Sequence, residues 1–509
     1  MADPSELVRP RSAVVPVLIC AAIIALLGIG GWFLINPPGL DADNEAMVTR
    51  QVHDLCAACH AYPPPDSFPK SAWKKEVIQG YQFAQEFRPD LLLPPIAEIV
   101  EYYERRAPER FDLPDVRPST RPLSITFEPI GDGCGPLEHA VSNVNVVHLF
   151  DERRAEILLC DMRANVVKLM KPYESTTRWQ VLAQAPHPVH TEVVDLDGDG
   201  IKDILVACLG QFLPTDQRCG RVLWLRGDKS GGFTPITLLD NVGRVADVRA
   251  ADFNVDGKLD LVVAEFGWRR IGSVRVLENR TTDWSKPVFV SHEIDPRHGA
   301  IHVPVADLNG DGKPDFVALI SQEHETVVAF INEGDFRFRK EVIYTAPHPA
   351  YGSSGIELVD LDGDGDLDVL YTNGDSVDNN LIRPDHGVQW LENRDSYPFV
   401  HHPIAPLFGA HRAIAADFRG TGLKDIVAVS FLPRRIFPEQ RDLDSIVLFE
   451  QTEPGKFARH RLEQGACDHV TCAAGDLFGN GRVDFVTGSF LLSTQAADAV
   501  TLWRHQGKK

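Results

Sequence analysis

The chain has 509 residues, which is too long for one ordinary hydrophobic core and predicts two or more domains. Its composition is globular, with 44% hydrophobic and 24% charged residues. A formal net charge of −21 excludes the basic surface of a nucleic-acid-binding protein, so we expect no nucleic-acid partner.

An apolar run without charges occupies residues 14–35. As a helix it would extend roughly 33 Å, enough to cross a bilayer. Arg9 and Arg11 precede it and acidic residues follow, which predicts residues 1–13 in the cytoplasm and the bulk of the chain in the periplasm of a bacterial-type cell. A cleaved signal peptide is the alternative, but its apolar region would be only about 7–15 residues long. We therefore expect a single-pass signal anchor in the cytoplasmic membrane.

Residues 44–112 are expected to be helical and contain a Cys-x-x-Cys-His motif formed by Cys56, Cys59 and His60. In such a motif two thiols attach heme and the histidine ligates its iron. Zinc would need a second ligand pair, which does not occur before His139. The region resembles a small cytochrome c domain, and the resemblance implies covalent heme c.

The second axial ligand of the iron stays open, because neither Met nor His occurs between residues 61 and 112. The alternatives are a tyrosine, a histidine from the C-terminal part of the chain, or a five-coordinate iron. The candidate tyrosines are Tyr81, Tyr102 and Tyr103.

A Pro-rich linker, residues 113–122, separates this domain from a repetitive region that covers residues 123–509. An acidic loop recurs there at spacings of 53 to 59 residues, beginning at Asp195, Asp252, Asp307, Asp360, Asp417 and Asp476. Each loop lies between two β runs, and two more runs follow, which is the content of a propeller blade. A seventh repeat without an acidic loop precedes them, and residues 123–127 supply the strand that the last repeat lacks. The sequence predicts a mainly-β fold, a seven-bladed β-propeller preceded by a transmembrane helix and a small all-α domain.

Four of the loops share the pattern Asp-x-Asp/Asn-x-Asp-Gly-x-x-Asp, which suits Ca²⁺ because that ion takes about six to eight oxygen ligands. The expected ligands of four calcium sites are Asp195, Asp197, Asp199 and Asp203; Asp252, Asn254, Asp256 and Asp260; Asp307, Asn309, Asp311 and Asp315; and Asp360, Asp362, Asp364 and Asp368. An EF-hand is excluded, because its glutamate at the twelfth position is replaced by strand residues.

These loops resemble the FG-GAP/VCBS repeats of integrin α-subunit-like propellers, and the resemblance implies that the ions are structural. Two loops depart from the pattern. The fifth has Arg419 at a ligand position, where a fixed positive charge would replace an ion, and the sixth has Phe478.

Segments that lead into the blades are rich in basic side chains, which should meet at the mouth opposite the acidic loops. They are His139, His187, His190, Arg244, His298, His302, His348, His411, Arg412 and His469. This mouth is a candidate site for a small anionic or glycan ligand, or for docking of the heme domain. Zinc or copper remains an alternative, although the sequence fixes no ligand spacing.

Six cysteines outside the motif and the apolar run allow disulfides in an exported protein. Cys208 and Cys219 flank a short loop and are the most favourable pair. Buried free thiols are the alternative for Cys160 and Cys472, which occur in apolar runs.

These features predict an exported c-type cytochrome that transfers electrons to or from a redox protein partner. One alternative is an oxidoreductase whose propeller passes substrate electrons to the heme, which would act as the electron acceptor. Another is an integrin-like adhesion or glycan-binding module. No catalytic residue is predicted, since no nucleophile triad, phosphate loop or dinucleotide motif is evident.

Overall fold

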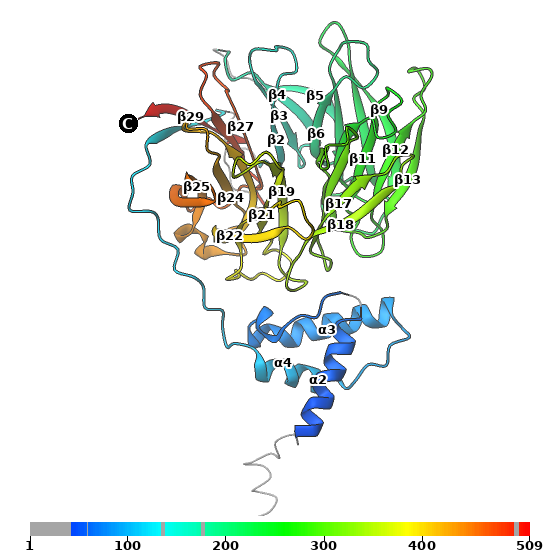
Figure 1. The fold of residues 1–509 in the computed structure, drawn as a ribbon, viewed down its shortest axis with the longest axis vertical. Coiled ribbons are helices and arrows are strands. Elements are labelled where there is room, and N and C mark those ends of the chain that lie inside the picture. The colour runs from blue at the N-terminus through cyan, green and yellow to red at the C-terminus, as the bar shows by residue number, and fades with distance from the viewer. Residues whose placement is uncertain (1–41, 59, 134–137, 175–178, 493–497, 509) are drawn as a thin grey trace, which may run out of the picture. The chain divides into compact units, whose positions relative to one another are not determined.

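The computed structural model describes residues 42–508 apart from 59, 134–137, 175–178 and 493–497 (Figure 1). The expected membrane span and Cys59 lie outside the described residues. Among the helices within these ranges, none is long and apolar enough to cross a membrane. The chain divides into two compact units, Met1–Ala58 with Lys70–Arg106, and Cys59–Pro69 with Ala107–Lys509.

The first unit contains α2 (Ala42–Cys56), α3 (Lys70–Phe87) and α4 (Ile96–Arg106). Helix α4 buries Ile99, Tyr102 and Tyr103, a spacing that places them on one face. Trp73 of α3 stacks on Tyr103 with ring centroids 3.7 Å apart, and α4 contacts both other helices. The expected helices therefore occur, and they end at Arg106.

The second unit begins with the short 3-10 helix η1 (Pro65–Ser67) and continues, after an extended stretch, into a ring of seven β-sheets. Blades 1 to 3 consist of β2 (Val141–Val147), β3 (Glu156–Asp161), β4 (Val166–Met170) and β5 (Gln180–Gln184); β6 (Pro188–Val194), β7 (Asp203–Cys208), β8 (Gly220–Gly227) and β9 (Phe233–Val242); and β10 (Val245–Ala251), β11 (Asp260–Glu265), β12 (Ser273–Asn279) and β13 (Phe289–Asp295).

Blades 4 to 6 are built in the same order, and blade 6 also carries the 3-10 helix η2 (Pro438–Asp442). Their strands are β14 (Ala300–His302), β15 (Val305–Ala306), β16 (Asp315–Ile320), β17 (Thr326–Asn332) and β18 (Phe338–Thr345); β19 (Ser353–Val359), β20 (Asp368–Asn373), β21 (Gly387–Glu392) and β22 (Val400–Pro406); and β23 (Ala410–Ala416), β24 (Asp425–Ser430), β25 (Asp444–Glu453) and β26 (Lys456–Gln464). In blade 4 the first strand is divided into β14 and β15 at Pro304, which cannot donate to the ladder.

Blade 7 closes the ring with strands from both ends of the second unit. It combines β27 (Thr471–Gly475), β28 (Asp484–Gly488) and β29 (Val500–Lys508) with β1 (Ile125–Gly131). Strand β1 pairs antiparallel with β29, so that Pro129 lies opposite Trp503. The first strands of successive blades contact one another around the ring, from β2 through β6, β10, β14, β19 and β23 to β27 and back to β2. The predicted seven-bladed propeller and its closure are confirmed, since β1 pairs with the strand β29 that ends the last blade.

The core lies between neighbouring sheets. Every residue of the second strands β3, β7, β11, β16, β20 and β24 is buried. The middle of each of these strands is mostly apolar because both of its faces pack on other sheets, whereas each strand begins with a buried Asp or Glu.

The expected disulfide between Cys208 and Cys219 is wrong, since both are free thiols. Cys208 packs in the apolar cluster between blades 1 and 2, whereas the thiol of Cys219 faces the Leu209 carbonyl at 3.4 Å. Cys160 and Cys472 are buried free thiols, which was the alternative to disulfides for these two residues.

Candidate heme-attachment and metal sites

The first cysteine of the motif is the last residue of α2. Burial raises the pKa of the Cys56 thiol, and a hydrogen bond with Tyr103 partly offsets this shift. In the same unit, Arg88 donates to the carbonyl of Ala58 at 3.2 Å and so holds the backbone within the motif. The thiol is thus positioned by a helix end and by an aromatic residue of α4.

His60 belongs to the second unit, and its Nδ1 lies 2.7 Å from the carbonyl oxygen of Ala61. A metal-ligating histidine almost always donates its other ring N–H to an oxygen in this way. The contact leaves Nε2 as the nitrogen that can ligate iron. An imidazole held in this way is suited to ligate iron.

The three candidate axial tyrosines have different surroundings. Tyr81 donates to the Pro94 carbonyl at 2.7 Å, and burial raises the pKa of Tyr81 to about 12, which disfavours a phenolate ligand. Tyr102 lies beneath the Arg106 guanidinium at 4.1 Å. Tyr103 lies beside the Cys56 thiol and lowers the pKa of that thiol, against the effect of burial.

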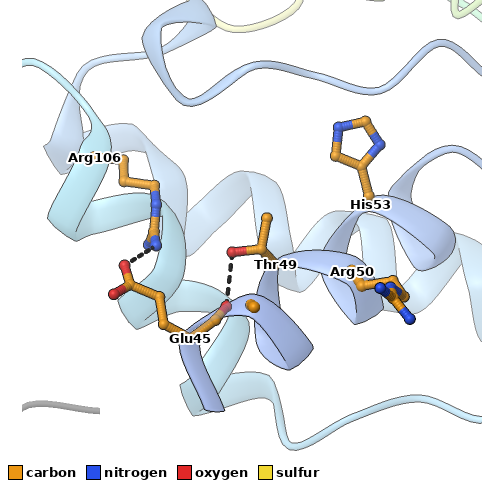
Figure 2. A pocket seen from close by; sticks show the side chains of 6 residues that line it. Glu45, Thr49, Arg50, His53 and Arg106 are labelled. Atoms are coloured by element: carbon orange, nitrogen blue, oxygen red, sulfur yellow. Dashed lines mark hydrogen bonds and ion pairs between the residues drawn. The ribbon is translucent and has the colours of Figure 1, made fainter. Parts of the chain in front are cut away.

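A shallow polar pocket lies on the helical unit but contains no residue of the motif (Figure 2). Arg106 of α4 lies 2.5 Å from Glu45 of α2, and the Thr49 hydroxyl donates to the Glu45 carbonyl at 2.8 Å. His53 lines the same pocket. The contact between Arg106 and Glu45 joins α4 to α2, whereas the Thr49 bond lies within α2.

In each acidic loop the first aspartate shapes the turn. Asp195 accepts hydrogen bonds from the amides of Asp199 at 3.1 Å and Gly200 at 2.9 Å. Gly200 has a φ of 84°, a conformation that favours glycine. Equivalent amides, five and six positions into the loop, contact Asp252, Asp307, Asp417 and Asp476. The turn therefore forms in loops with and without the full ligand pattern.

The last aspartate of the pattern has a second role that sequence reasoning missed. Asp203 is buried at the start of β7 and accepts the amides of Leu196 at 3.0 Å and Gly227 at 2.8 Å, which ties the loop to the end of the third strand. The same pair of bonds recurs at Asp260, Asp315, Asp368 and Asp484. In blade 1 the buried Glu156 replaces it and accepts the Leu149 amide at 2.8 Å. The sequence did contain an indication of this role: Asp484 is present although Phe478 stands at a predicted ligand position of the same loop.

In two of the full loops, three carboxylate oxygens lie within 4.8 Å of one another; they belong to Asp195, Asp197 and Asp203, and to Asp360, Asp362 and Asp364. Burial and the neighbouring carboxylates raise the pKa of Asp368 to about 6. Bound calcium would offset the free-energy cost of keeping this carboxylate charged, because a nearby cation favours the charged form. Arg226 lies 2.6 Å from Asp197 and would compete with the ion in the first loop.

The loops that begin at Asp252 and Asp307 have asparagine as their third residue. The Asn254 side chain donates to Asp256 at 3.1 Å, and the Asn309 oxygen accepts the Asp311 amide at 2.9 Å. All these side chains remain within one turn. An asparagine oxygen is also a suitable calcium ligand.

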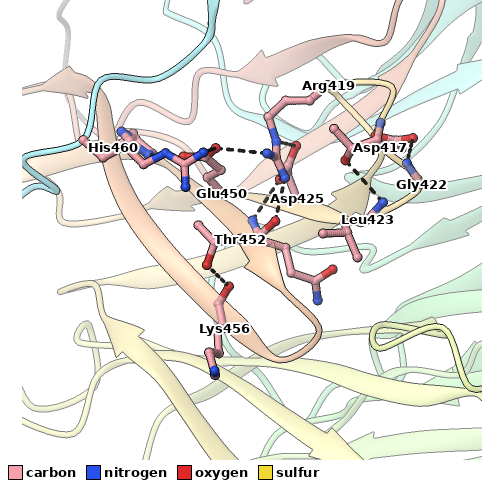
Figure 3. Close-up of polar contacts among 12 residues, drawn as sticks. Asp417, Arg419, Gly422, Leu423, Asp425, Glu450, Thr452, Lys456 and His460 are labelled. Atoms are coloured by element: carbon pink, nitrogen blue, oxygen red, sulfur yellow. Dashed lines mark hydrogen bonds and ion pairs between the residues drawn. The ribbon is translucent and has the colours of Figure 1, made fainter.

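The fifth loop contains an arginine where the four full loops have Asp or Asn (Figure 3). Arg419 donates to Asp425 at 2.9 and 3.0 Å and to Glu450 at 2.9 Å. His460 lies 3.0 Å from the other oxygen of Glu450. The guanidinium is nearly buried and supplies the positive charge between these carboxylates. In the sixth loop, Phe478 lies under the Arg504 guanidinium at 4.7 Å and offers no ligand atom.

The histidines expected at one mouth lie mostly beside carboxylates. The pairs are His139 with Asp161 at 3.2 Å, His190 with Asp247 at 2.8 Å, His298 with Glu323 at 3.1 Å, His348 with Asp385 at 2.9 Å and His469 with Glu463 at 3.0 Å. Burial lowers the pKa of both His190 and His411 to about 4. These side chains therefore supply less positive charge than their number suggests.

A cavity lined by both polar and apolar side chains lies between blades 1 and 2 and extends to Arg249 of blade 3. Its lining includes Asn145, Thr191, Glu192, Lys202 and Arg249. Burial raises the pKa of Glu192 to about 7. Sequence reasoning did not single out this cavity, because its residues come from the inner strands of three different blades.

The fold defines the class of protein as a seven-bladed β-propeller with an additional helical unit. Comparison with protein families shows FG-GAP-like repeats at residues 195–263 and 307–371, two stretches that each contain two full acidic loops. No curated protein matches the chain.

Among solved structures, the chain is similar to an Agrocybe aegerita lectin whose structure is described in terms of specific recognition of non-reducing terminal N-acetylglucosamine. The identity is 15%, the match covers 71% of this chain and 85% of that chain, and the TM-score is 0.39. At this level the similarity supports no argument about what the present chain binds.

Proposed function

We propose that the chain is a membrane-anchored, exported c-type cytochrome that transfers electrons, with a calcium-stabilised propeller that docks a redox protein partner. The observation that carries the proposal is the histidine of the Cys-x-x-Cys-His motif. The Nδ1 of His60 contacts the Ala61 carbonyl, which leaves Nε2 as the nitrogen that can ligate a metal. A redox dithiol would not need this histidine.

Bound heme supplies one-electron redox chemistry, and the protein sets its surroundings. Cys56 and Cys59 would attach the group, and His60 would ligate its iron. Tyr103, stacked on Trp73 and beside the Cys56 thiol, would exclude water from the attachment site. The propeller contributes a rigid ring, in which calcium would neutralise the carboxylates of the four full loops.

Heme staining of a denaturing gel tests the proposal. The full chain, expressed with a heme-attachment system, should stain. Cys56→Ala or Cys59→Ala should weaken the stain and the double variant should abolish it, whereas Cys219→Ala, a thiol in the propeller, should leave it unchanged. A full-length band that does not stain would refute the cytochrome assignment.

The cavity between blades 1 and 2 favours a second candidate, a propeller that binds a glycan or a small polar substrate. Glu192 and Arg249 line this cavity together with the Asn145 amide, a mixture of donors and acceptors suited to hydroxyl groups. Reduction of the heme by sugars or alcohols, lost in Glu192→Gln, would establish an oxidoreductase. Glycan binding without reduction would indicate a recognition module.

A further inference from the structure

Blade 4 brings two imidazoles and one carboxylate together at the end of its second strand. His298 lies in the segment that leads into β14, and Glu323 and His324 lie in the turn between β16 and β17. One potential ligand atom from each residue lies within 4.8 Å of the other two. The Nε2 of His298 is 3.1 Å from Glu323 Oε1, and the two imidazole centroids are 5.3 Å apart.

The two segments that carry these side chains are fixed to each other. The carbonyl of Gly299 accepts hydrogen bonds from both the amide of Ser321 at 2.8 Å and its hydroxyl at 3.0 Å. His324 in turn donates its amide to the Ser321 carbonyl at 3.2 Å. On the other side, a Cβ at Gly272 would lie 2.5 Å from the Cβ of His298, so glycine allows this close approach. The three side chains are thus presented by a cross-linked backbone.

An ion pair alone does not account for the cluster. The buried Nδ1 of His298 has no hydrogen-bond partner among the described residues. A pair between His298 and Glu323 also needs no second imidazole, yet a ring nitrogen of His324 lies within 4.8 Å of ligand atoms of both residues. Each of the three residues is partly accessible, so an ion could reach them from solvent.

We propose that His298, Glu323 and His324 form a binding site for one divalent transition-metal ion, with Zn²⁺ the best suited. Two imidazole nitrogens and one carboxylate oxygen are typical zinc ligands, whereas Ca²⁺ prefers oxygen alone. Zinc bonds of about 2.0–2.2 Å place tetrahedral ligand atoms roughly 3.4 Å apart, so small side-chain rotations would close the site. Three protein ligands leave a fourth position for water or an external ligand.

This site is separate from the calcium loop of the same blade. The acidic loop Asp307–Asp315 precedes β16, and the turn with Glu323 and His324 follows it. Six strand residues place the two about 20 Å apart, on opposite faces of the propeller. Saturation of the loops with calcium should therefore leave zinc binding unchanged, and zinc binding does not depend on the heme.

Zinc titration of the full chain in excess calcium, by calorimetry and by elemental analysis after dialysis, tests the proposal. His298→Ala and His324→Ala should each lose one bound zinc equivalent. Glu323→Gln keeps the side-chain volume. It should lower the affinity for this zinc ion by more than roughly 10–100-fold, which is the loss expected when a residue that only hydrogen-bonds to a metal ligand is removed. His292→Ala is the matched control, because His292 contacts Glu278 at 2.9 Å and stacks on Phe336 without a third ligand.

Thermal melts without metal establish whether each variant is folded, and only folded variants are compared. Loss of the equivalent in the three variants and its retention in His292→Ala would support the site. The same zinc stoichiometry and affinity in the wild type and in Glu323→Gln would overturn it, as would displacement of the zinc by calcium.

Discussion

The first and the fifth acidic loops make the same turn with different means of neutralising charge. In both, the opening aspartate, Asp195 or Asp417, accepts the amides five and six positions into the loop. In both, a buried aspartate begins the second strand and accepts an amide from the end of the third. The loops differ at the third position, where the first has Asp197 and the fifth has Arg419.

This difference separates the shape of the loop from its charge. Backbone amides and glycine produce the turn, since the fifth loop has it without the carboxylate pattern. The carboxylates at the third and fifth positions are additional, and they repel one another unless a cation is present. Arg419 provides a permanent cation, whereas we propose that the four full loops take an ion from solution.

Calcium removal should give the largest effect. At a hundredfold excess over the dissociation constant each bound ion stabilises the folded state by about 2.7 kcal/mol, and four full loops add their shares. We expect chelation to lower the unfolding temperature of the propeller markedly, calcium to restore it, and magnesium to restore it poorly because it prefers tight octahedral geometry. Thermal melts of the full chain measure this. Coincident curves with and without chelator would contradict it.

Arg419→Ala should cost about 3–5 kcal/mol, because it leaves the buried carboxylate of Asp425 without its cation and removes one of the cations beside Glu450. The loss should be equal in calcium and in chelator. Arg394→Ala is the control, since the Arg394 side chain is exposed and His402 stays beside Glu392, so the loss should be at most about 1 kcal/mol. Chemical denaturation measures both variants. A loss that disappears in chelator would mean that the fifth loop also depends on an ion.

Asp362→Ala should behave in the opposite way. In saturating calcium it should lose up to one site's share, about 2.7 kcal/mol, and in chelator it should be neutral or slightly stabilising because it removes a repelling charge. The same denaturation curves, recorded in calcium and in chelator, give both values. An equal loss in the two conditions would show that Asp362 serves the fold and not an ion.

Asp484→Asn should cost about 1–3 kcal/mol, because one of the two buried amides that Asp484 accepts, those of Leu477 and His505, loses its acceptor. The sixth loop lacks a full ligand set, so calcium should not change this value. Asp476→Asn, at the exposed start of the same loop, is the comparison and should cost less. Unchanged stability of Asp484→Asn would remove the structural role assigned to this position.

Much of the propeller could be predicted because its repeats are periodic. The spacing of the acidic loops predicted the number of blades. The last repeat lacks a strand after Trp503, which predicted that β1 would complete blade 7. Glu156 illustrates the limit, since nothing local marks it as the counterpart of Asp203. Their shared role depends on amides that only the folded sheets bring close.

The errors have similar causes. Cys208 and Cys219 are close in sequence, but Cys208 points into the core between blades 1 and 2. The carboxylate neighbours of the histidines were also missed, because they lie elsewhere in the chain: Asp247 of blade 3 contacts His190 of blade 2. The sequence could not predict which side chains would form a metal site. His298 and Glu323 lie on different segments of blade 4, and only the fold brings them together.

The number of calcium ions bound per chain tests the central claim most directly. Equilibrium dialysis followed by elemental analysis should find about four ions, one for each full loop. Asp362→Ala should bind one ion fewer, and Thr421→Val, which changes the corresponding turn of the fifth loop, should bind the same number as the wild type. Absence of bound calcium, or an unchanged number in Asp362→Ala, would contradict the account.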